Sequence, residues 1–251
     1  MRPRFLRGFW KLTWLETKIF TREPMGFFGT LVMPLVVFIA LGRALGANKP
    51  APAPDIDLPF NPAILAAVLI AISAVQSLVA IISIYREGGI LKRLRATPLS
   101  PVTIMGAQVA VKLAFTVISL SLLMLAGRRL FPGVMQVNVF SFTLAVLLGT
   151  FSILSLGFVL ASLVPTARFA QPIGAAVLYP MLFLSGLFFP VTRLPRALEA
   201  IAYVLPTTHA VALLQGVWDG SGWAAHWVNA MALLVLFGAY TALSTRVFRW
   251  E

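Results

Sequence analysis

Side chains that could carry out catalysis are sparse in this chain and do not cluster. Among its eight acidic residues, Asp55 and Asp57 form the closest pair, but they lie in the proline-rich stretch "ANKPAPAPDIDLPFN". An enzyme that transfers a phosphoryl or prenyl group would need clustered carboxylates to hold Mg²⁺. His209 and His226 are seventeen positions apart and the chain has no cysteine, so we expect no metal site.

Two further kinds of chemistry also lack their residues. No stretch follows the pattern G-x-x-x-x-G-K-[ST], whose backbone amides cradle the phosphates of ATP. No serine has a legible histidine partner that would activate it as a nucleophile. We interpret His209 as a hydrogen-bonded loop residue rather than as a proton relay. The sequence therefore predicts no catalytic residues and no cofactor bound by this chain.

The composition indicates a membrane protein that crosses the bilayer several times. Hydrophobic residues make up 59% of the chain and charged residues 11%, whereas soluble domains carry roughly 25% charged residues. The net charge of +12 would also fit a nucleic-acid-binding protein. The charges lie in short gaps between apolar stretches, however, and basic loops on the cytoplasmic side of a membrane explain them better. We expect no nucleic-acid partner.

We expect an all-α integral membrane protein with a single transmembrane domain covering residues 1–251. A helix needs about 20 apolar residues to cross a hydrocarbon layer of about 30 Å. Six stretches satisfy this length. The predicted spans are residues 27–46, 62–85, 102–127, 139–164, 172–190 and 224–244.

The distribution of lysine and arginine predicts the orientation of these spans. If the N-terminus is cytoplasmic, thirteen of the 20 basic residues lie on the cytoplasmic side and six on the outer side, and Lys112 lies within a span. Cytoplasmic loops usually carry the excess of positive charge. We therefore expect a multi-pass protein of the inner or plasma membrane with both termini in the cytoplasm.

Residues 1–25 are too charged to span the membrane, and "FLRGFWKLTWLETKIFT" predicts an amphipathic helix in the interface. Arg7, Lys11 and Lys18 fall in one sector of this helix, opposite an apolar side. Glu16 interrupts the apolar side, which predicts a protein partner for it or a bend. A simple membrane anchor and a specific binding role both fit. Proline at position 24 should end the helix at Arg22–Glu23.

Residues 191–223 contain two apolar pieces, 198–205 and 210–217, separated by Pro206. Each piece is too short to cross the membrane. We expect two short re-entrant helices that dip into the outer leaflet, since irregular backbone at that depth must pack against protein. A surface loop with two amphipathic turns is the alternative.

Residues 86–100, "REGGILKRLRATPLS", predict a short cytoplasmic amphipathic helix between the second and third spans. Ile90, Leu91 and Leu94 share one side of it, and Pro98 ends it. An apolar ridge needs a surface to pack on. The bilayer, the N-terminal helix and a separate cytoplasmic protein all satisfy this need.

Three stretches resemble the type-2 permease family of ABC exporters. Residues 86–100 match in Arg86-Glu87, Gly88, Leu91, Leu94 and the run Thr97-Pro98-Leu99-Ser100. Residues 184–216 resemble the closing signature of that family, and Arg22-Glu23-Pro24 precedes the first span as it does there. Gln215 departs from the pattern, because many members have arginine. In the closing signature the residues that carry the resemblance are Gly186, Phe189, Pro190, Leu194, Pro195, Leu205, Pro206, His209 and Leu214.

The resemblance implies a permease that dimerises, with itself or with a related permease, and pairs with two copies of a separate P-loop ATPase that holds ATP and Mg²⁺. The helix within residues 86–100 would then be a coupling helix seated on the ATPase. Its apolar ridge would anchor it, and Arg93 and Arg95 would fix its register. The residues implied in coupling are Arg86, Glu87, Gly88, Ile90, Leu91, Arg93, Leu94, Arg95 and Pro98.

A few polar residues inside the spans are candidates to line a translocation path, namely Gln76, Gln108, Lys112 and Tyr179. Hydrogen bonding between helices is the alternative for the glutamines. A charge at the depth of Lys112 costs roughly 2.5–3.5 kcal/mol, so this side chain must face a polar cavity or extend to the inner surface.

The function predicted from these observations is outward transport of a lipophilic drug-like or lipid-linked molecule, driven by ATP hydrolysis in the separate subunit. Two alternatives belong to other classes. A lipid-modifying membrane enzyme would act without ATP or a partner and would need a cluster of metal-binding acids. A structural or assembly protein would not depend on Arg93 and Arg95 more than on other basic loop residues.

Overall fold

The computed structural model describes residues 2–44, 61–90, 101–131, 137–164 and 166–247. The described part is all helical and contains no strand, which confirms the predicted all-α class. Five of its helices are long and apolar enough to cross a membrane, and a bent pair of shorter helices forms a sixth such segment if the pair is counted as one span. The protein is therefore a multi-pass membrane protein.

The chain begins with helix α1 (Arg2–Arg22), which ends just before Pro24 as the sequence predicts. The short helix α2 (Pro24–Phe27) leads into a wider π-helical turn, η1 (Phe28–Val32), and then into α3 (Met33–Ala44). Together η1 and α3 form an apolar helix from Phe28 to Ala44, the last described residue before position 61, and this helix lies within the predicted first span.

The π turn has a local cause in Pro34. Proline has no N–H to donate to the carbonyl of Thr30, and its ring would clash with that carbonyl in a regular α-helix. The wider turn relieves the clash. The hydroxyl of Ser119, on another helix, donates to the Thr30 carbonyl at 2.7 Å. A side chain from a neighbouring helix therefore supplies the hydrogen bond that the proline cannot make.

Three long helices form the middle of the bundle: α4 (Pro62–Glu87), α6 (Pro101–Leu130) and α7 (Val139–Leu163). Helices α4 and α7 begin at asparagine caps, where the side chains of Asn61 and Asn138 accept hydrogen bonds from the first turn. Both are largely buried and pack against each other. At Gly157 a Cβ atom would stand 2.9 Å from Val75, so the absence of a side chain permits this close packing.

Helix α8 (Ala167–Leu184) differs from the predicted span 172–190 at both ends. It starts before Pro172 and contains both Pro172 and Pro180. Prolines are tolerated inside membrane helices when neighbouring helices satisfy the freed carbonyls. It ends early because Gly186 takes a φ of +83°, a conformation that does not continue a helix. Residues 185–190 form a turn outside the helix.

Two short helices follow a single turn of 3-10 helix, η2 (Val191–Arg193): α9 (Arg196–Val204) and α10 (Pro206–Trp218), whose axes meet at 80°. This is the predicted pair divided by Pro206, and its depth in the membrane stays a prediction. The single turn α11 (Gly222–Ala225) precedes the last helix, α12 (Trp227–Val247). The predicted sixth span, 224–244, therefore begins within α11 and ends before α12 does.

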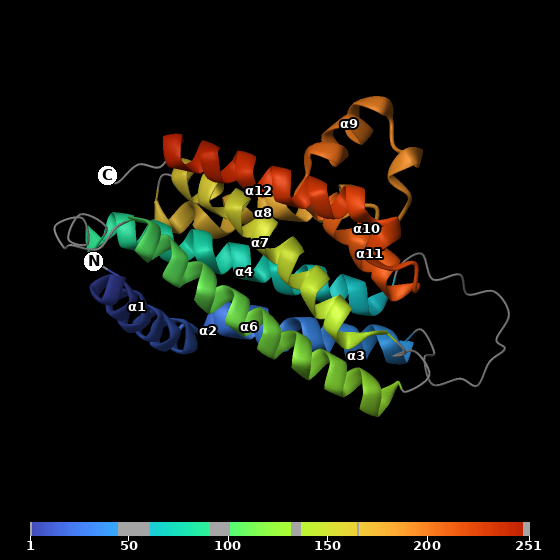
Figure 1. Cartoon of the computed structure of the whole chain (residues 1–251), viewed down its shortest axis with the longest axis horizontal. Coiled ribbons are helices and arrows are strands. Elements are labelled where there is room, and N and C mark those ends of the chain that lie inside the picture. The colour runs from blue at the N-terminus through green and yellow to red at the C-terminus, as the bar shows by residue number, and fades with distance from the viewer. Residues whose placement is uncertain (1, 45–60, 91–100, 132–136, 165, 248–251) are drawn as a thin grey trace, which may run out of the picture.

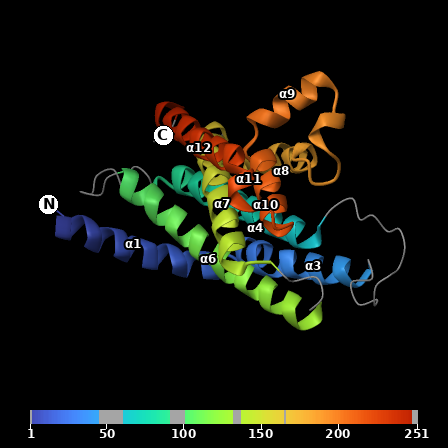
Figure 2. The same cartoon turned by 45° about the vertical axis from the view of Figure 1, so that its right-hand side comes forward.

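Both chain termini lie at the same end of the bundle, together with the C-terminal end of α4 and the N-terminal end of α6 (Figure 1). Helices α9, α10 and α11 lie at the opposite end, and the view turned by 45° shows the same arrangement (Figure 2). We call these the terminal half and the distal half of the bundle. Which half faces the cytoplasm stays a prediction.

Candidate functional site

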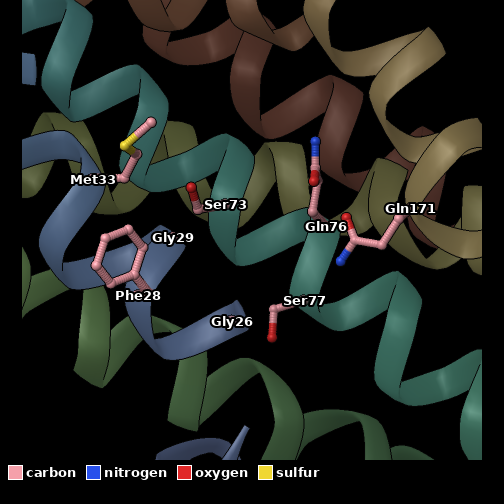
Figure 3. Close-up of a pocket in the computed structure, with 8 residues that line it drawn as sticks. All are labelled: Gly26, Phe28, Gly29, Met33, Ser73, Gln76, Ser77 and Gln171. Carbon is pink, nitrogen blue, oxygen red and sulfur yellow. The ribbon is translucent and has the colours of Figure 1, made fainter. Parts of the chain in front are cut away.

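A groove lined by both polar and apolar side chains lies between α2, η1, the start of α3, α4 and α8 and has a volume of about 390 Å³. Its polar side chains are neutral hydroxyls and amides: Ser73, Gln76 and Ser77 from α4 and Gln171 from α8. Figure 3 shows the two glutamines near one end of the groove and Phe28 with Met33 near the other. The groove therefore offers hydrogen bonds and an apolar surface side by side.

Behind the groove lies a buried charged network that shares Ser77 with it. Lys112, which is 1% exposed, extends from α6 and donates to the Ser77 hydroxyl at 2.6 Å. Ser77 in turn donates to the carboxylate of Glu23 at 3.3 Å. The ring of Phe20 covers the ammonium group, with its centroid 3.9 Å away. Lys112 therefore faces the interior of the bundle and does not extend to a membrane surface.

Gly26 makes this arrangement possible. A Cβ atom at this position would lie 2.8 Å from the Ser77 hydroxyl and 2.9 Å from the Glu23 carboxylate. The close approach of α2 to α4 needs a residue without a side chain there. The network thus depends on the backbone that follows Arg22-Glu23-Pro24 as well as on the charged groups themselves.

A fully buried carboxylate, Glu16 of α1, is bound by Tyr85 of α4. The Tyr85 hydroxyl donates to both carboxylate oxygens, at 3.0 and 2.9 Å. Burial raises the pKa of the Glu16 carboxyl, and the Tyr85 and Gln108 side chains and the charge of Lys112 offset part of that effect. The partner that the sequence predicted for Glu16 is therefore a residue of the same chain.

The four residues predicted to line a path occupy three different environments. Gln76 lines the polar groove. Gln108 and Lys112 are buried on the α6 side of α4 and do not line it. Tyr179, on α8, is 46% exposed and does not line the groove. Only Gln76 therefore fits the predicted role directly, and Lys112 reaches the groove only through Ser77.

The last turn of α4 forms hydrogen bonds with the junction between α7 and α8. The guanidinium of Arg86 donates to the carbonyls of Val164 at 2.9 Å and Ala161 at 2.6 Å, at the C-terminal end of α7. The adjacent Glu87 accepts a hydrogen bond at 3.0 Å from the backbone N–H of Ala167, the first residue of α8. The positive charge of Arg86 thus lies at the negative, C-terminal end of α7, and the negative charge of Glu87 lies at the positive, N-terminal end of α8.

Arg86 and Glu87 were predicted as ATPase-coupling residues, and the contacts described above lie within the chain. Gly88 caps α4, and its neighbour Gly89 has a φ of +66°. Ile90 is 36% exposed. The remaining coupling residues, Leu91, Arg93, Leu94, Arg95 and Pro98, lie outside the described residues, so the coupling assignment stays a prediction.

Several residues of the predicted outer signature shape the backbone of the distal half. Gly186 turns the chain after α8, and a Cβ atom there would meet Val191 at 3.0 Å. Pro190 and Pro195 are the residues that precede η2 and α9. Pro206 is buried and opens α10. Phe189 is 39% exposed in the turn after α8.

His209 joins three helices of the distal half through its ring nitrogens. Nε2 lies 2.9 Å from the backbone carbonyl of Tyr203 in α9, and Nδ1 lies 3.0 Å from the Asn229 side chain in α12. Asn229 also approaches Nδ1 of His226 at 3.4 Å. These bonds agree with the interpretation of His209 as a hydrogen-bonded residue, but it lies in helix α10 and not in a loop as predicted, because Pro206 starts a helix there. Within the described residues, no three His, Asp or Glu side chains gather closely enough to hold a metal ion.

The sequence analysis identified several residues of this site but not the groups with which they form hydrogen bonds. Glu23 and Arg86 stood out in the sequence, but nothing near them indicates Ser77 or the carbonyls of α7 as their partners. Tyr85 and Gln171 were not singled out at all. The one usable signal was Glu16, a carboxylate on the apolar side of an amphipathic helix, which needs a partner in any packed structure.

Comparisons with known proteins bear on the whole chain. The sequence model of a family described as ABC-2 type transporter matches residues 7–218. The inner membrane transport permease YhhJ of Escherichia coli K12 is 27% identical over 166 residues, which are 65% of this chain and 44% of that protein. Nodulation protein J of Rhizobium leguminosarum bv. viciae is 43% identical over 61 residues, 24% of each chain. Nodulation protein J of Bradyrhizobium diazoefficiens is 34% identical over 100 residues, 38% of each. The chain thus spans less than half the length of these relatives.

Proposed function

This chain belongs to the ABC-2 type transporter family, and from that premise we propose that it is the transmembrane permease subunit of an ATP-driven exporter. In this proposal it is not itself a catalyst, and a separate P-loop ATPase binds ATP and Mg²⁺. Two ATPase subunits act on two permease copies, identical or related, in the inner membrane with both permease termini in the cytoplasm. The relative YhhJ, an inner membrane transport permease by name, supports that location.

The single observation that carries the proposal is the set of hydrogen bonds that joins the end of α4 to α7 and α8, which we call the joint. Residues 91–100, which include Leu91 and Leu94 of the predicted ridge and the basic residues, connect α4 to α6. Arg86 and Glu87 stand directly before this segment and hold the ends of α7 and α8. A displacement of the coupling segment by an ATPase would therefore move α4 together with α7 and α8, as one rigid body.

Helix α8 also carries Gln171, which lines the polar groove with residues of α2, η1 and α4. Movement of α4 and α8 against α2 and η1 would change the shape of this groove. The groove and the buried network behind it are thus suitably placed to respond to ATP hydrolysis. This link between the joint and the groove supports a translocation role for Gln76.

The proposed substrate is a lipophilic drug-like or lipid-linked molecule that moves outward. Such a molecule has an apolar part and a part that forms hydrogen bonds. The groove combines neutral hydroxyls and amides with Phe28 and Met33, which matches both parts. The groove lining contains no charged side chain, which favours a substrate whose polar part is uncharged.

The test is purification of the tagged chain in mild detergent from its native host, followed by mass spectrometry of the bound proteins. We expect a P-loop ATPase to co-purify with the wild type and to be lost from Leu91→Asp, because a carboxylate cannot occupy an apolar docking groove. Leu198→Asp is the matched control, since Leu198 is exposed on α9 in the distal half.

Retention of the ATPase by Leu91→Asp would contradict the docking role of residues 86–100. Absence of an ATPase from every sample, together with lipid-modifying activity of the chain alone, would favour the enzyme alternative. Loss from both aspartate variants would indicate a general folding defect, which thermal unfolding of each variant would detect.

A further inference from the structure

A second groove, which Lys112 does not line, has no role in the proposed transport. It has a volume of about 520 Å³ and lies between α6 and α12, with α7 as its floor and Phe9 of α1 at its edge. Its lining is almost entirely apolar, with Leu113, Phe158 and Phe237 among the larger side chains. We call it the lateral groove.

The lateral groove opens on the side of the bundle that faces the membrane. Helix α12 is the least buried of the five long apolar helices, with 11% of its most apolar window buried, and α6 is less than half buried. An apolar hollow at that position is not filled by water, because it offers almost no hydrogen-bonding partners. Hydrocarbon or another protein must fill it.

The groove lies in the terminal half and runs inward from near its end. On α6 the lining begins at Gly106, close to the helix start at Pro101, and on α12 it extends to Thr245, close to the helix end. The rings of Phe151 and Phe237 stack at the deeper end, with centroids 4.2 Å apart. From Phe237 to Thr245 the groove extends about 12 Å along α12, and one leaflet is about 15 Å deep.

The length of the groove distinguishes between its two candidate occupants. An α-helix has an overall diameter of about 10 Å, and an acyl chain is thinner. The length of the groove along α12, about 12 Å, is close to the depth of one leaflet, about 15 Å, which an acyl chain spans. This match favours a lipid over a helix from a second copy.

Charge at the shallow end indicates which lipids are preferred. Arg246 is exposed in the last turn of α12, directly after the lining residues Ser244 and Thr245. The first two turns of α1, at the same end of the bundle, contain Arg2, Arg4 and Arg7 in their sequence. None of the lining residues is acidic. Basic residues at the membrane surface attract anionic headgroups.

We propose that the lateral groove binds one acyl chain of an anionic phospholipid from the surrounding bilayer, with the phosphate near Arg246. The hydroxyls of Ser244 and Thr245 lie at the shallow end, where the glycerol backbone would be, and the stacked phenylalanines lie where the chain would end. The bound lipid would separate α6 from α12 without being transported. This inference does not depend on the proposed function.

The test measures lipid retention by native mass spectrometry of the purified full chain. Phosphatidylglycerol or phosphatidylcholine with the same acyl chains is added in detergent. We expect the wild type to retain phosphatidylglycerol. Ala110→Phe should bind this lipid at least about tenfold more weakly, because the ring occupies space that methylene groups of the lipid would fill. Ile118→Phe is the matched control, because Ile118 is exposed on α6 and does not line the groove.

Arg246→Gln should bring the affinities for the two lipids to within about twofold of each other by removing the charge near the phosphate. Thr241→Phe fills the groove from the opposite wall and serves if Ala110→Phe does not fold. Equal phosphatidylglycerol retention by the wild type and both filling variants would overturn the proposal. Loss of a dimer in those variants with unchanged lipid binding would also overturn it, in favour of a second copy at this surface.

Discussion

In the terminal half of the bundle, lysine, glutamate and arginine side chains join helices that are far apart in the sequence, whereas the distal half is joined by a histidine–asparagine hydrogen bond and by backbone turns. The terminal half contains the Lys112–Ser77–Glu23 network, the Glu16–Tyr85 pair and the contacts of Arg86 and Glu87. The distal half is joined by the His209–Asn229 bond and by the turns at Gly186 and Pro206.

The difference between the two halves is a difference in how each responds to the loss of one partner. A buried charge that loses its partner keeps the full cost of its desolvation, so the loss of one partner in the terminal half strongly destabilises the folded state. A typical hydrogen bond contributes only about 1 kcal/mol to stability, so the contacts of the distal half can change at small cost. The terminal half is thus suited to transmit a displacement, and the distal half to accommodate one.

The largest effect is expected for Lys112→Met. This change leaves the half-buried carboxylate of Glu23 without its cation in the interior of the bundle and should lower the free energy of unfolding by about 3–5 kcal/mol. Thermal unfolding in detergent measures it. Adding Glu23→Gln should restore part of the loss, because both charges are then absent. Lys18→Met is the control, since Lys18 is exposed over Trp14. An unchanged Tm for Lys112→Met would show that the network is not needed for stability.

A smaller effect is expected for Arg86→Gln. The guanidinium makes two charged hydrogen bonds to backbone carbonyls, and their loss should cost about 2–3 kcal/mol. Hydrogen exchange should become faster at Ala161, Val164 and Ala167, where α7 and α8 meet. Arg168→Gln removes an exposed arginine from the same corner and should leave exchange unchanged. Exchange that rises equally in both variants would argue against the joint.

In the distal half we expect Gly186→Leu to cost about 1–2 kcal/mol, because a side chain disfavours a φ of +83° and would also press on Val191. Transport should fall in parallel, since the turn sets the position of α9. Gly238→Leu is the control, because a Cβ atom at Gly238 has open space around it. Normal stability and transport of Gly186→Leu would show that this turn does not need a residue without a side chain.

The smallest effect is a pH dependence that comes from Glu16. Burial raises the pKa of its carboxyl above the ordinary value of 4.5, so the protonated form is favoured in the folded protein. The stability that Glu16 contributes is complete below pH 4.5 and is lost as the pH rises through the raised pKa. Tm should therefore fall more steeply from pH 4.5 upward in the wild type than in Glu16→Gln. Identical slopes would contradict a buried, titrating Glu16.

The helices could largely be predicted from the sequence, because apolar length and proline position act locally. The end of α1 before Pro24 and the break at Pro206 follow from the absence of a proline N–H and the restriction it places on its neighbour. The limits of α8 could not be predicted in this way. Pro172 suggested a helix start, but packing in the bundle lets the helix continue through it.

The site was less predictable than the fold. Gln76 was identified and lines the groove, but Gln171, on its other wall, lies 95 positions away and carries no local mark. Arg86 and Glu87 were recognised as a motif, but their partners are backbone atoms, which every residue possesses. A single sequence contains no record of such pairings, because they form only when distant segments are packed together.

The π turn from Phe28 to Val32 has a consequence for the face that α3 presents to its neighbours. A π turn takes up one residue more than an α-helical turn, so the residues that follow it are rotated by about 100° relative to an uninterrupted α-helix. Phe38 follows this turn and is buried, with its ring centroid 5.6 Å from that of Phe131. A one-residue deletion within the π turn would therefore restore a regular helix and turn Phe38 away from Phe131.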